Sequence, residues 1–448
     1  MPEQTWYAAL GLAACVGLDW AMDKHAVTVK DLDSGQRERC QLGNTPEAVE
    51  LWAGGLAVRF GGRPVAVALE QSRGAVISML SKYAHLLLFP VHPKALADYR
   101  KALHPSGAKD DPTDGDLLEE FLELHGRGLR MWQPDTEATR SLQWLTEERR
   151  KFVGDQTRFA QRLRGQLQRY YPQVLQWFDQ IDTPLVLAFL RRWPTLEEVK
   201  KAKPATLRRF FQQHNCRQQS KIEERIQAIA SAVAATLDTA VILSGRLAVA
   251  TLVDQLEAIH TGIAAYDRQI AEITLAHPDN ELMDSFPGAG PAMRPRLIAA
   301  LGTRRDRYLN AAEIQRCSGI APLIERSGRQ YWVHWRWACS KFLRQTFHEW
   351  ASHSLAFSAW AREYYQAQRD QNKGHHAAVR SLAFEWIRIL FRCWKDRTPY
   401  DEAKYLQALI ARKPKQSRDL QSKLDRGKQP EFIWTSRNGF NKLVGFNY

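Results

Sequence analysis

The stretch AKDDPTDGDLLEEF, residues 108–121, concentrates carboxylates in a chain whose formal net charge is +14. Five of them lie between Asp110 and Glu119. Carboxylates this close repel one another and each requires solvation, so the stretch is either a solvated surface or a site for a divalent cation. A cation site would need further oxygen ligands from elsewhere in the chain.

The acidic stretch leads into a predicted helix, DGDLLEEFLELH. Pro112 and Gly115 disfavour helical backbone at the start of the stretch, so we expect its first residues to be non-helical. Asp111 and Asp114 are three residues apart at the mouth of this helix, a spacing that points both in the same direction.

Two further carboxylates end predicted strands. The apolar run ACVGLDWA contains Asp19, and the apolar strand PVAVALE ends in Glu70. The carboxyl ends of strands in an α/β sheet are where ligands gather. Asp19, Glu70, Asp111 and Asp114 thus come from three places in the chain, and together they suit Mg²⁺ or Mn²⁺, hard cations that also accept phosphate oxygens. Two such ions about 3.5 to 4 Å apart would hold both the attacking and the leaving oxygen of a phosphodiester.

Each of these carboxylates also has an ordinary interpretation. Asp19 is typical of a turn at a strand end, and the acidic stretch is typical of the negative charge that favours a helix N-terminus. The conjunction of all four positions is what favours the metal site.

The first 150 residues alternate strand and helix patterns. Three consecutive strands are followed by a helix, a strand, a helix and a strand, which is the order of the ribonuclease-H-like fold, an α/β domain. The strands are predicted in ACVGLDWA, HAVTVKDLD, RERCQLGN, PVAVALE and HLLLFPVHP, and the helices in TPEAVELWAGGLAVRFGG, RGAVISMLSKYA and PKALADYRKAL.

The positive charge is distributed unevenly along the chain. The net charges of four successive segments are −4 for residues 1–150, +8 for 151–220, −4 for 221–280 and +14 for 281–448. Such a distribution is expected of a polyanion binder whose acidic first domain performs the chemistry, although a merely soluble basic protein would show the same net charge.

Residues 137–280 carry helical patterns without strands. Two long amphipathic stretches, TEERRKFVGDQTRFAQRLRGQLQRYYPQVLQWF and a second that runs from Lys221 to Ala276, enclose a short basic segment. This pattern predicts an antiparallel coiled-coil arm with a small cap, through which the protein forms a dimer or tetramer. The basic, aromatic first stretch either contacts nucleic acid or is a solvated helix face.

The C-terminal part opens with SFPGAGPAMRPRLIAALG, which resembles the turn of a helix-hairpin-helix and places Arg294 and Arg296 beside a phosphate-binding backbone. Tryptophans and arginines then alternate in RQYWVHWRWACSKFLRQ. This alternation suits nucleic acid, although the tryptophans fit a core equally well. The predicted nucleic-acid-binding side chains are Arg294, Arg296, Arg326, Arg329, Arg336, Lys341 and Arg344.

Composition excludes several classes of protein. No apolar run approaches the roughly 20 residues of a membrane helix, and no secretory signal pattern opens the chain. The six cysteines form no C-x-x-C pair, which argues against a zinc site or a disulfide scaffold, so we expect most of them to be buried, reduced thiols. We expect a soluble, cytoplasmic bacterial protein without membrane contact.

Together, GLDWAMDKHAV, the strand-terminal ALE, KDDPTDG, FPGAGP and SGIAPLIERSG resemble the DEDD-type insertion-sequence transposases over most of residues 12–400. The resemblance implies a RuvC-like domain, a coiled coil and a mainly helical transposase domain, in a recombinase guided by a structured bridge RNA that acts on donor and target DNA. It also implies that Asp19, Glu70, Asp111 and Asp114 bind the metal and that Ser327 is the catalytic serine. The expected domains are residues 1–136 (RuvC-like), 137–280 (coiled-coil arm), 281–400 (transposase domain) and 401–448 (basic tail).

Ser327 also has a purely structural interpretation, because a Ser-Gly pair usually forms a turn. No histidine is placed by the sequence to accept its proton, whereas a metal ion on the tetrad would lower the pKa of the hydroxyl. The glycine that the family often has soon after the lysine of its basic helix is absent near Lys341. Two alternatives remain: a RuvC-like metal-dependent nuclease or junction resolvase that uses water as the nucleophile, and an inactive nucleic-acid-binding scaffold. A sugar-kinase-like ATPase is disfavoured, because no glycine-rich phosphate loop follows Asp19.

Overall fold

The computed structural model describes residues 5–70, 74–103 and 111–412, and within these ranges it describes only the backbone of residues 111–113, 331 and 410–412. Most of the predicted basic tail therefore lies outside the described residues, as does the side chain of Asp111. The chain forms two compact units with a boundary between Pro134 and Asp135. The further predicted divisions at residues 280 and 400 stay predictions.

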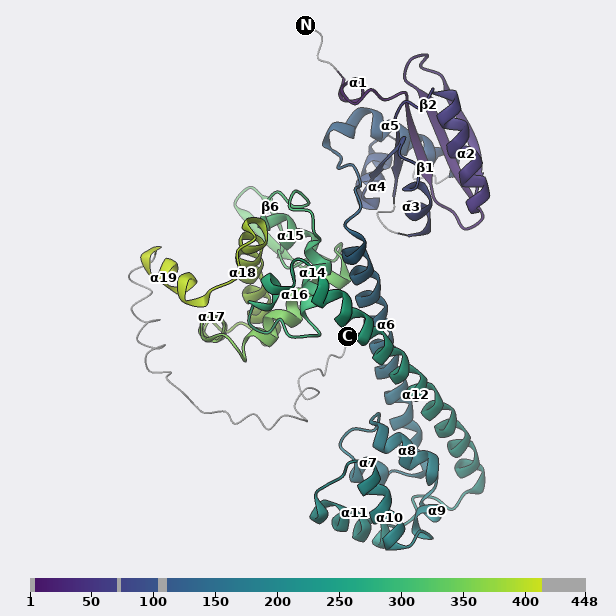
Figure 1. Ribbon diagram of the computed structural model, residues 1–448, viewed down its shortest axis with the longest axis vertical. Helices are drawn as coiled ribbons and strands as arrows, with labels where there is room; N and C mark the ends of the chain where they lie inside the picture. The colour runs from purple at the N-terminus through teal and green to yellow at the C-terminus, as the bar shows by residue number, and fades with distance from the viewer. Residues whose placement is uncertain (1–4, 71–73, 104–110, 413–448) are drawn as a thin grey trace. The chain divides into compact units, whose positions relative to one another are not determined.

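The first unit is built on a mixed five-stranded sheet, as the sequence predicted (Figure 1). The strand order is β3-β2-β1-β4-β5, with β2 antiparallel to β1 and β3, and with β1, β4 and β5 parallel. This arrangement is compatible with a ribonuclease-H-like domain. The strands are β1 (Ala14–Asp19), β2 (Lys24–Asp31), β3 (Arg37–Gly43), β4 (Val65–Leu69) and β5 (Leu86–Pro90).

Helices cover both faces of this sheet. The interior strand β4, with the sequence VAVAL, is buried along its whole length because it has strands on both sides and helices on both faces. The edge strand β3 is mainly polar and exposed. The helices of this unit are α1 (Trp6–Ala9), α2 (Pro46–Arg59), α3 (Ala75–Leu80), α4 (Pro93–Leu103), α5 (Asp111–His125) and the 3₁₀ helix η1 (Gly126–Gly128).

The start of α5 differs from the prediction, because the backbone is helical from Asp111 and includes both Pro112 and Gly115. Proline is tolerated in the first turn, where its missing N–H would have no helical acceptor. Gly115 lies where α5 crosses β2, and a Cβ built there would be 3.2 Å from Thr28 Oγ1. The glycine therefore allows close packing and does not delay the helix.

The second unit contains the remaining helices and a two-stranded hairpin. Its first part consists of α6 (Glu137–Tyr170), α7 (Val174–Trp177), α8 (Pro184–Arg192), α9 (Leu196–Lys200), α10 (Pro204–Gln213), α11 (Gln219–Ser231) and α12 (Thr239–Ala276). Its second part consists of α13 (Asn280–Asp284), α14 (Arg294–Leu301), α15 (Ala311–Cys317), β6 (Leu323–Ser327), β7 (Gln330–His334), α16 (Lys341–Ser354), α17 (Ala359–Asp370), α18 (His375–Asp396) and α19 (Glu402–Arg412).

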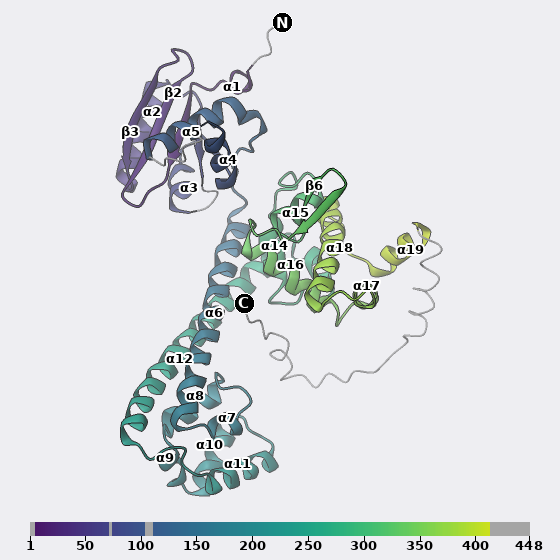
Figure 2. The ribbon, with the colours of Figure 1, turned by 180° about the vertical axis from the view of Figure 1, so that it is seen from behind.

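Helices α6 and α12 lie side by side and antiparallel (Figures 1 and 2). Three contacts fix their register. Arg149 Nη2 donates to Asp267 Oδ2 at 3.0 Å, Gln156 Nε2 lies 3.2 Å from His260 Nε2, and Gly245 packs against the Tyr170 ring. As one residue number rises the other falls, which defines an antiparallel pair. The predicted coiled coil and its role in oligomerisation stay predictions.

The sequence predicted one continuous helix for the second long amphipathic stretch. The structure shows two helices there instead. Helix α11 ends at Ser231, and Ala232 adopts an extended conformation with ψ 142°. Helix α12 begins after Asp238, whose carboxylate accepts hydrogen bonds from Ala240 N and Val241 N. The N-cap therefore starts a new helix inside an apolar pattern that gave no sign of a break.

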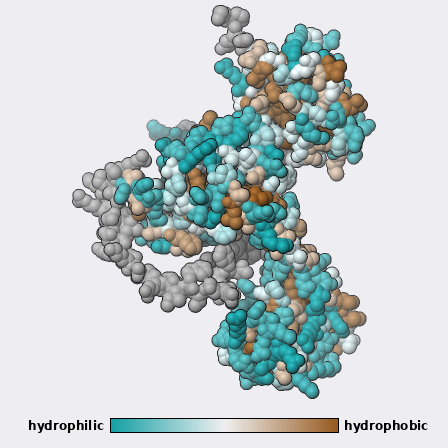
Figure 3. Space-filling view, in the orientation of Figure 1, coloured by the Kyte–Doolittle hydropathy of each residue, from teal (hydrophilic) through white to brown (hydrophobic). Residues whose placement is uncertain are grey.

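By length and composition, α12 is the one helix among the described residues that could cross a membrane. Its apolar side chains also have partners within the protein, since Val249, Leu252, Val253 and Leu256 belong to a core shared with α6 and α8. The same core contains the aromatic residues of the cap formed by α7 to α11. Figure 3 shows that the surface on the viewed face is mainly hydrophilic, with scattered hydrophobic patches.

Tryptophans dominate the core of the second part of this unit. Trp350, Trp386 and Trp394 are fully buried. The Trp350 indole N–H donates to Pro287 O at 3.1 Å, in the FPGAGP turn, and a Cβ on Gly288 would lie 2.8 Å from Ser354 N. The glycine of this turn is thus required for close packing against α16. The helix-hairpin-helix assignment stays a prediction.

We expect Gly17→Ala to destabilise the first unit by about 3 kcal/mol or more, because overpacked backbone contacts cannot relax. A Cβ on Gly17 would lie 2.0 Å from Gly115 O and 2.5 Å from Glu119 N of α5. The control is Gly54→Ala on α2, where a Cβ meets nothing within 4 Å; it should be neutral or stabilising by up to about 1 kcal/mol. Urea unfolding of the full chain measures both, and equal stabilities would contradict the packing argument.

Candidate active site

Asp19 and Glu70 lie on neighbouring parallel strands at the same edge of the sheet. Leu18 of β1 pairs with Leu69 of β4, so the two carboxylates follow at the next position of each strand. Neighbouring strands are about 4.8 Å apart. The structure therefore places these two predicted site residues next to each other.

Helix α5 covers the sheet face on which the Asp19 side chain lies. Cys15 packs on the α5 side of β1, and the backbone of α5 passes directly over Gly17, so alternation along the strand puts Asp19 on the same face. Gly115 contacts Ala26, the residue that pairs with Asp19. The first turn of α5 thus lies at the carboxyl end of β1.

Asp114 immediately precedes this contact and is buried, with 4% of the residue exposed. It forms an ion pair with Arg100 of α4. Among the residues whose side chains are described, no three Asp, Glu, His or Cys side chains gather closely enough to hold a metal. Asp111 begins the same helical turn, but its side chain lies outside the described residues. The structure places Asp19, Glu70 and Asp114 at the same edge of the sheet, but it does not gather their side chains into a metal-binding cluster.

The other carboxylates of the acidic stretch anchor α5 to the sheet. Asp116 accepts a hydrogen bond from Thr28 Oγ1 of β2 at 2.8 Å and forms an ion pair with Arg39 of β3. Glu123 pairs with Lys30 Nζ at 2.6 Å. The basic and hydroxyl side chains of β2 and β3 therefore pair with these carboxylates, which explains how part of the acidic stretch is stabilised.

Glu119 is the most buried of these carboxylates, since none of its side chain is exposed. Burial raises its pKa to about 7, and the charge of Arg37, whose Nη2 lies 2.7 Å from Glu119 Oε2, opposes that rise. The nearby Glu123 charge raises the pKa further and Lys30 lowers it. Glu119 is thus a titratable group held between α5 and the sheet, one helical turn beyond the candidate metal ligands.

Ser327 lies at the turn of an exposed hairpin. It is the last residue of β6 and pairs with Gln330 of β7 across a two-residue turn whose first residue, Gly328, has φ 58°. Glycine adopts this backbone conformation without steric cost. Ser327 and both residues of the turn are exposed, so the hydroxyl is accessible to a large substrate.

The predicted nucleic-acid-binding residues fall into three groups. Arg326, Arg329 and Lys341 are exposed, whereas Arg336 and Arg344 are half-buried at the base of the hairpin. Arg294 and Arg296 retain only 16% and 15% side-chain exposure and form ion pairs with Asp284 and Glu349. These two would have to exchange partners before they contact a phosphate.

Two protein-family models match this chain. A model described as "Transposase", of the DEDD type, matches residues 16–172, and a model described as "Transposase IS116/IS110/IS902 family" matches residues 280–366. Together they span more than half of the chain, including both the carboxylate edge and the hairpin. The chain belongs to the IS110 family of DEDD transposases.

Bacterial relatives agree with this membership. A protein of Streptomyces coelicolor named "Mini-circle putative transposase for IS117" is 27% identical over 408 residues, which cover 89% of this chain and 98% of the relative. The IS110 insertion-element protein of the same species is 26% identical over 81% of this chain and 89% of its own length. The IS116 protein of Streptomyces clavuligerus is 26% identical over 66% of this chain and 73% of its own length.

The structure of this transposase also reveals features that the sequence did not predict. The Arg100 partner of Asp114 was missed, because the pairing joins two helices and leaves no spacing signal. The expectation of buried thiols was mostly wrong. Only Cys15 is buried, while Cys40 and Cys317 are exposed and the other three are half-buried. Cys40 lies on the edge strand β3 and Cys317 ends α15, and at such positions the residue type alone does not determine whether the side chain is buried.

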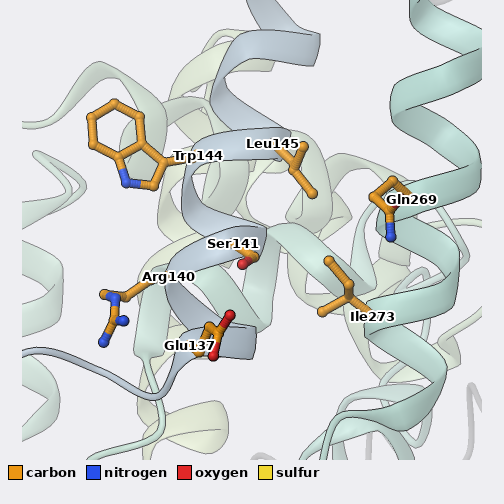
Figure 4. Close-up of a pocket in the computed structure, with 7 residues that line it drawn as sticks. All are labelled: Glu137, Arg140, Ser141, Trp144, Leu145, Gln269 and Ile273. Carbon is orange, nitrogen blue, oxygen red and sulfur yellow. The ribbon is translucent and has the colours of Figure 1, made fainter.

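A surface groove of about 490 Å³ lies between α6 and α12 of the transposase (Figure 4). Residues from α6 and α12 line it: Glu137, Arg140, Ser141, Trp144, Leu145, Gln269 and Ile273. None of the predicted site residues belongs to this groove.

We expect Glu119 to make stability pH-dependent. The pKa of Glu119 is raised from 4.5 to about 7 in the folded state, so its protonated form favours folding. This contribution to the free energy of unfolding is complete below pH 4.5 and is lost as the pH rises through about 7. Glu119→Gln stays neutral, so its stability relative to the parent should grow by up to about 3 kcal/mol between about pH 4 and pH 8.

Urea unfolding of the full chain at several pH values measures this difference. The control is Glu120→Gln, since Glu120 is the adjacent residue and accepts a hydrogen bond from Tyr99 OH at 3.0 Å. Its stability should run parallel to that of the parent. A Glu119→Gln curve that is also parallel to the parent would show that Glu119 does not titrate in this range.

Proposed function

We propose that this transposase cleaves and rejoins DNA through a covalent bond between Ser327 and a DNA phosphate, assisted by Mg²⁺ or Mn²⁺ on an acidic tetrad. Membership of a transposase family implies DNA cleavage and rejoining. The observation that carries the serine assignment is the exposure of Ser327 on a glycine turn between two exposed arginines, Arg326 and Arg329. A phosphodiester can approach such a hydroxyl without displacing any part of the fold.

In the proposed reaction, Ser327 Oγ attacks the phosphorus and forms an O–P bond, while the bond between phosphorus and one sugar oxygen breaks. The serine loses its proton and the leaving sugar oxygen gains one. The phosphodiester bond energy is conserved in the protein–DNA ester, so a second DNA end can reverse the reaction without ATP. The exposed Arg326 and Arg329 offset the negative charge of the phosphate.

Asp19, Glu70, Asp111 and Asp114 would hold the metal. The fit rests on the chemistry of the donor set, which is all carboxylate oxygen, and on the common sheet edge of Asp19, Glu70 and the first turn of α5. A bound divalent ion supplies Lewis-acid stabilisation of the phosphate and a lower pKa for a nearby hydroxyl. Arg100 keeps Asp114 neutralised and fixed in position before a metal binds.

Nucleic acid would bind mainly to the basic second unit. Residues 281–448 hold 29 basic and 15 acidic residues, which suits counterion release from a polyanion. We further propose guidance by a structured RNA and assembly into a dimer or tetramer through α6 and α12. The RNA guidance follows from the resemblance to bridge-RNA-guided recombinases, and the assembly follows from the two long amphipathic helical stretches.

We expect Asp19→Asn and Asp114→Asn to lower DNA cleavage by about 100-fold or more while leaving DNA binding intact, since each removes one anionic metal ligand. Strand cleavage with Mg²⁺ and calorimetric titration with Mn²⁺ measure the two effects.

The matched control is Asp116→Asn on the same helical turn. Asp116 faces Thr28 and Arg39, away from the candidate ligands, so this variant should cleave normally. Wild-type cleavage by Asp114→Asn would show that the tetrad assignment is wrong.

A covalent protein–DNA species should form with Ser327 and disappear in Ser327→Ala. A nicked substrate traps this species, and mass spectrometry of the denatured mixture locates the crosslinked peptide. The fold should persist, because loss of one exposed hydroxyl usually changes stability by less than about 0.5 kcal/mol.

The control is Ser340→Thr. Ser340 caps α16 by accepting from Leu343 N at 3.3 Å, and threonine keeps the capping oxygen, so the adduct should still form. Ser318 is fully buried and donates to Gln315 O, which makes it unsuitable as a control. If Ser327→Ala still cuts DNA and leaves free ends, water is the nucleophile and the chain is a RuvC-like nuclease. If no variant or parent cuts, the protein is a binding scaffold.

A further inference from the structure

Trp335, the residue that follows β7, lies between two guanidinium groups. Arg380 Cζ lies 3.6 Å from the centroid of the Trp335 ring, and Arg344 Cζ lies 5.1 Å from it. Arg344 comes from the first turns of α16 and Arg380 from those of α18, two helices that pack together. One arginine from each of two packed helices therefore meets the same aromatic ring at the base of the hairpin.

No carboxylate balances these two charges among the described residues. Arg344 donates to backbone oxygens and to Cys339 Sγ, and none of the hydrogen bonds or ion pairs of the described residues involves the Arg380 guanidinium. Arg344 Nε, Arg380 Nε and Trp335 Nε1 are all buried without an acceptor. A cation–π contact contributes about 0.5–2 kcal/mol, which does not replace the hydrogen bonds that these donors lack.

The surroundings increase the positive potential. Burial, followed by the Arg344 charge, lowers the pKa of Arg380. His348 lies one turn after Arg344, and its ring centroid is 5.7 Å from that of His376, one turn before Arg380. Burial lowers the pKa of His348 to about 4, and Arg380, His375 and His376 lower it as well. Burial is the main cause of this shift, but the contribution of Arg380 shows that its positive charge acts on His348, and a local excess of positive charge favours an anion.

We propose that Arg344, Arg380 and Trp335 form a binding site for a backbone phosphate of nucleic acid at the base of the catalytic hairpin. Both arginines are half-buried, so a strand on the surface can reach them, and Arg380 belongs to no set of residues predicted from the sequence. The inference rests on the proposed function, because the site would hold the same DNA strand that Ser327 attacks at a second position.

This phosphate is not the one that Ser327 attacks. Trp335 is five residues beyond Gln330, the pairing partner of Ser327, which corresponds to about 17 Å along an extended strand. That length equals about five nucleotides along a duplex strand. Arg380 is thus a positioning residue that fixes the register of the flanking strand.

The test compares Arg380→Gln with the parent in binding to a fluorescent DNA duplex, to its single strand and to RNA of the same sequence. We expect affinity to fall about tenfold for the nucleic acid that the site holds, and the slope of log K against log salt to decrease by about one for a duplex or 0.7 for a single strand. The arm that changes identifies DNA or RNA as the source of the phosphate.

The matched control is Arg388→Gln on the same helix, because Arg388 is exposed and pairs with Glu385 at 3.1 Å. It should bind like the parent. Arg380→Lys keeps the charge but loses the planar guanidinium, so it should keep the salt slope while binding severalfold more weakly. If Arg380→Gln does not fold, as judged by thermal unfolding, Arg380→Lys decides the question.

The proposal would be overturned if Arg380→Gln had the affinity and salt slope of the parent for duplex DNA, single-stranded DNA and RNA alike. It would also be overturned if Arg380→Lys bound with the affinity of the parent. The covalent adduct is measured separately at saturating protein. An Arg380→Gln variant that binds weakly but still forms the Ser327 adduct supports both proposals. Loss of phosphate binding together with no adduct in the parent would support this site and reject the serine chemistry.

Discussion

The first unit depends on one close contact, the packing of the α5 backbone over Gly17 of β1. No residue with a Cβ fits there, and the contact fixes both the height and the direction of α5 on the sheet. Since Gly115 contacts Ala26 and Glu123 reaches Lys30, α5 runs antiparallel to β1, with its acidic first turn at the carboxyl end of the strand. The placement of Asp114 near Asp19 and Glu70 follows from that direction.

The same contact sorts the carboxylates of α5 into two kinds. Those that face β2 and β3 find Thr28, Arg39, Arg37 and Lys30, and they attach the helix to the sheet. Asp114 is turned away from these strands and meets Arg100 of α4. Glu119 is the costly member of the first kind, because a fully buried carboxylate beside one guanidinium keeps a pKa near 7.

The second unit shows the opposite electrostatic pattern. Arg294 and Arg296 have carboxylate partners and support the tryptophan core, whereas Arg344 and Arg380 share one indole ring and have no carboxylate partner among the described residues. Protein charges that are paired internally contribute to the fold, and those left unpaired at a surface favour an external anion. The proposed reaction needs both: a carboxylate edge for a metal, and unpaired guanidinium groups for the phosphates.

The sequence by itself determined the order of strands and helices in the first unit, the positions of Asp19 and Glu70 at strand ends, the glycine turn after Ser327 and the uneven charge. These are local properties, because the period of apolar residues and the backbone preference of glycine act within a few positions. Tertiary structure alone decided that α5 is already helical at Asp111, that Arg100 pairs with Asp114, and that Arg380 lies on Trp335. Each of these depends on which elements touch and in which register, and such contacts join residues whose distance along the chain carries no signal.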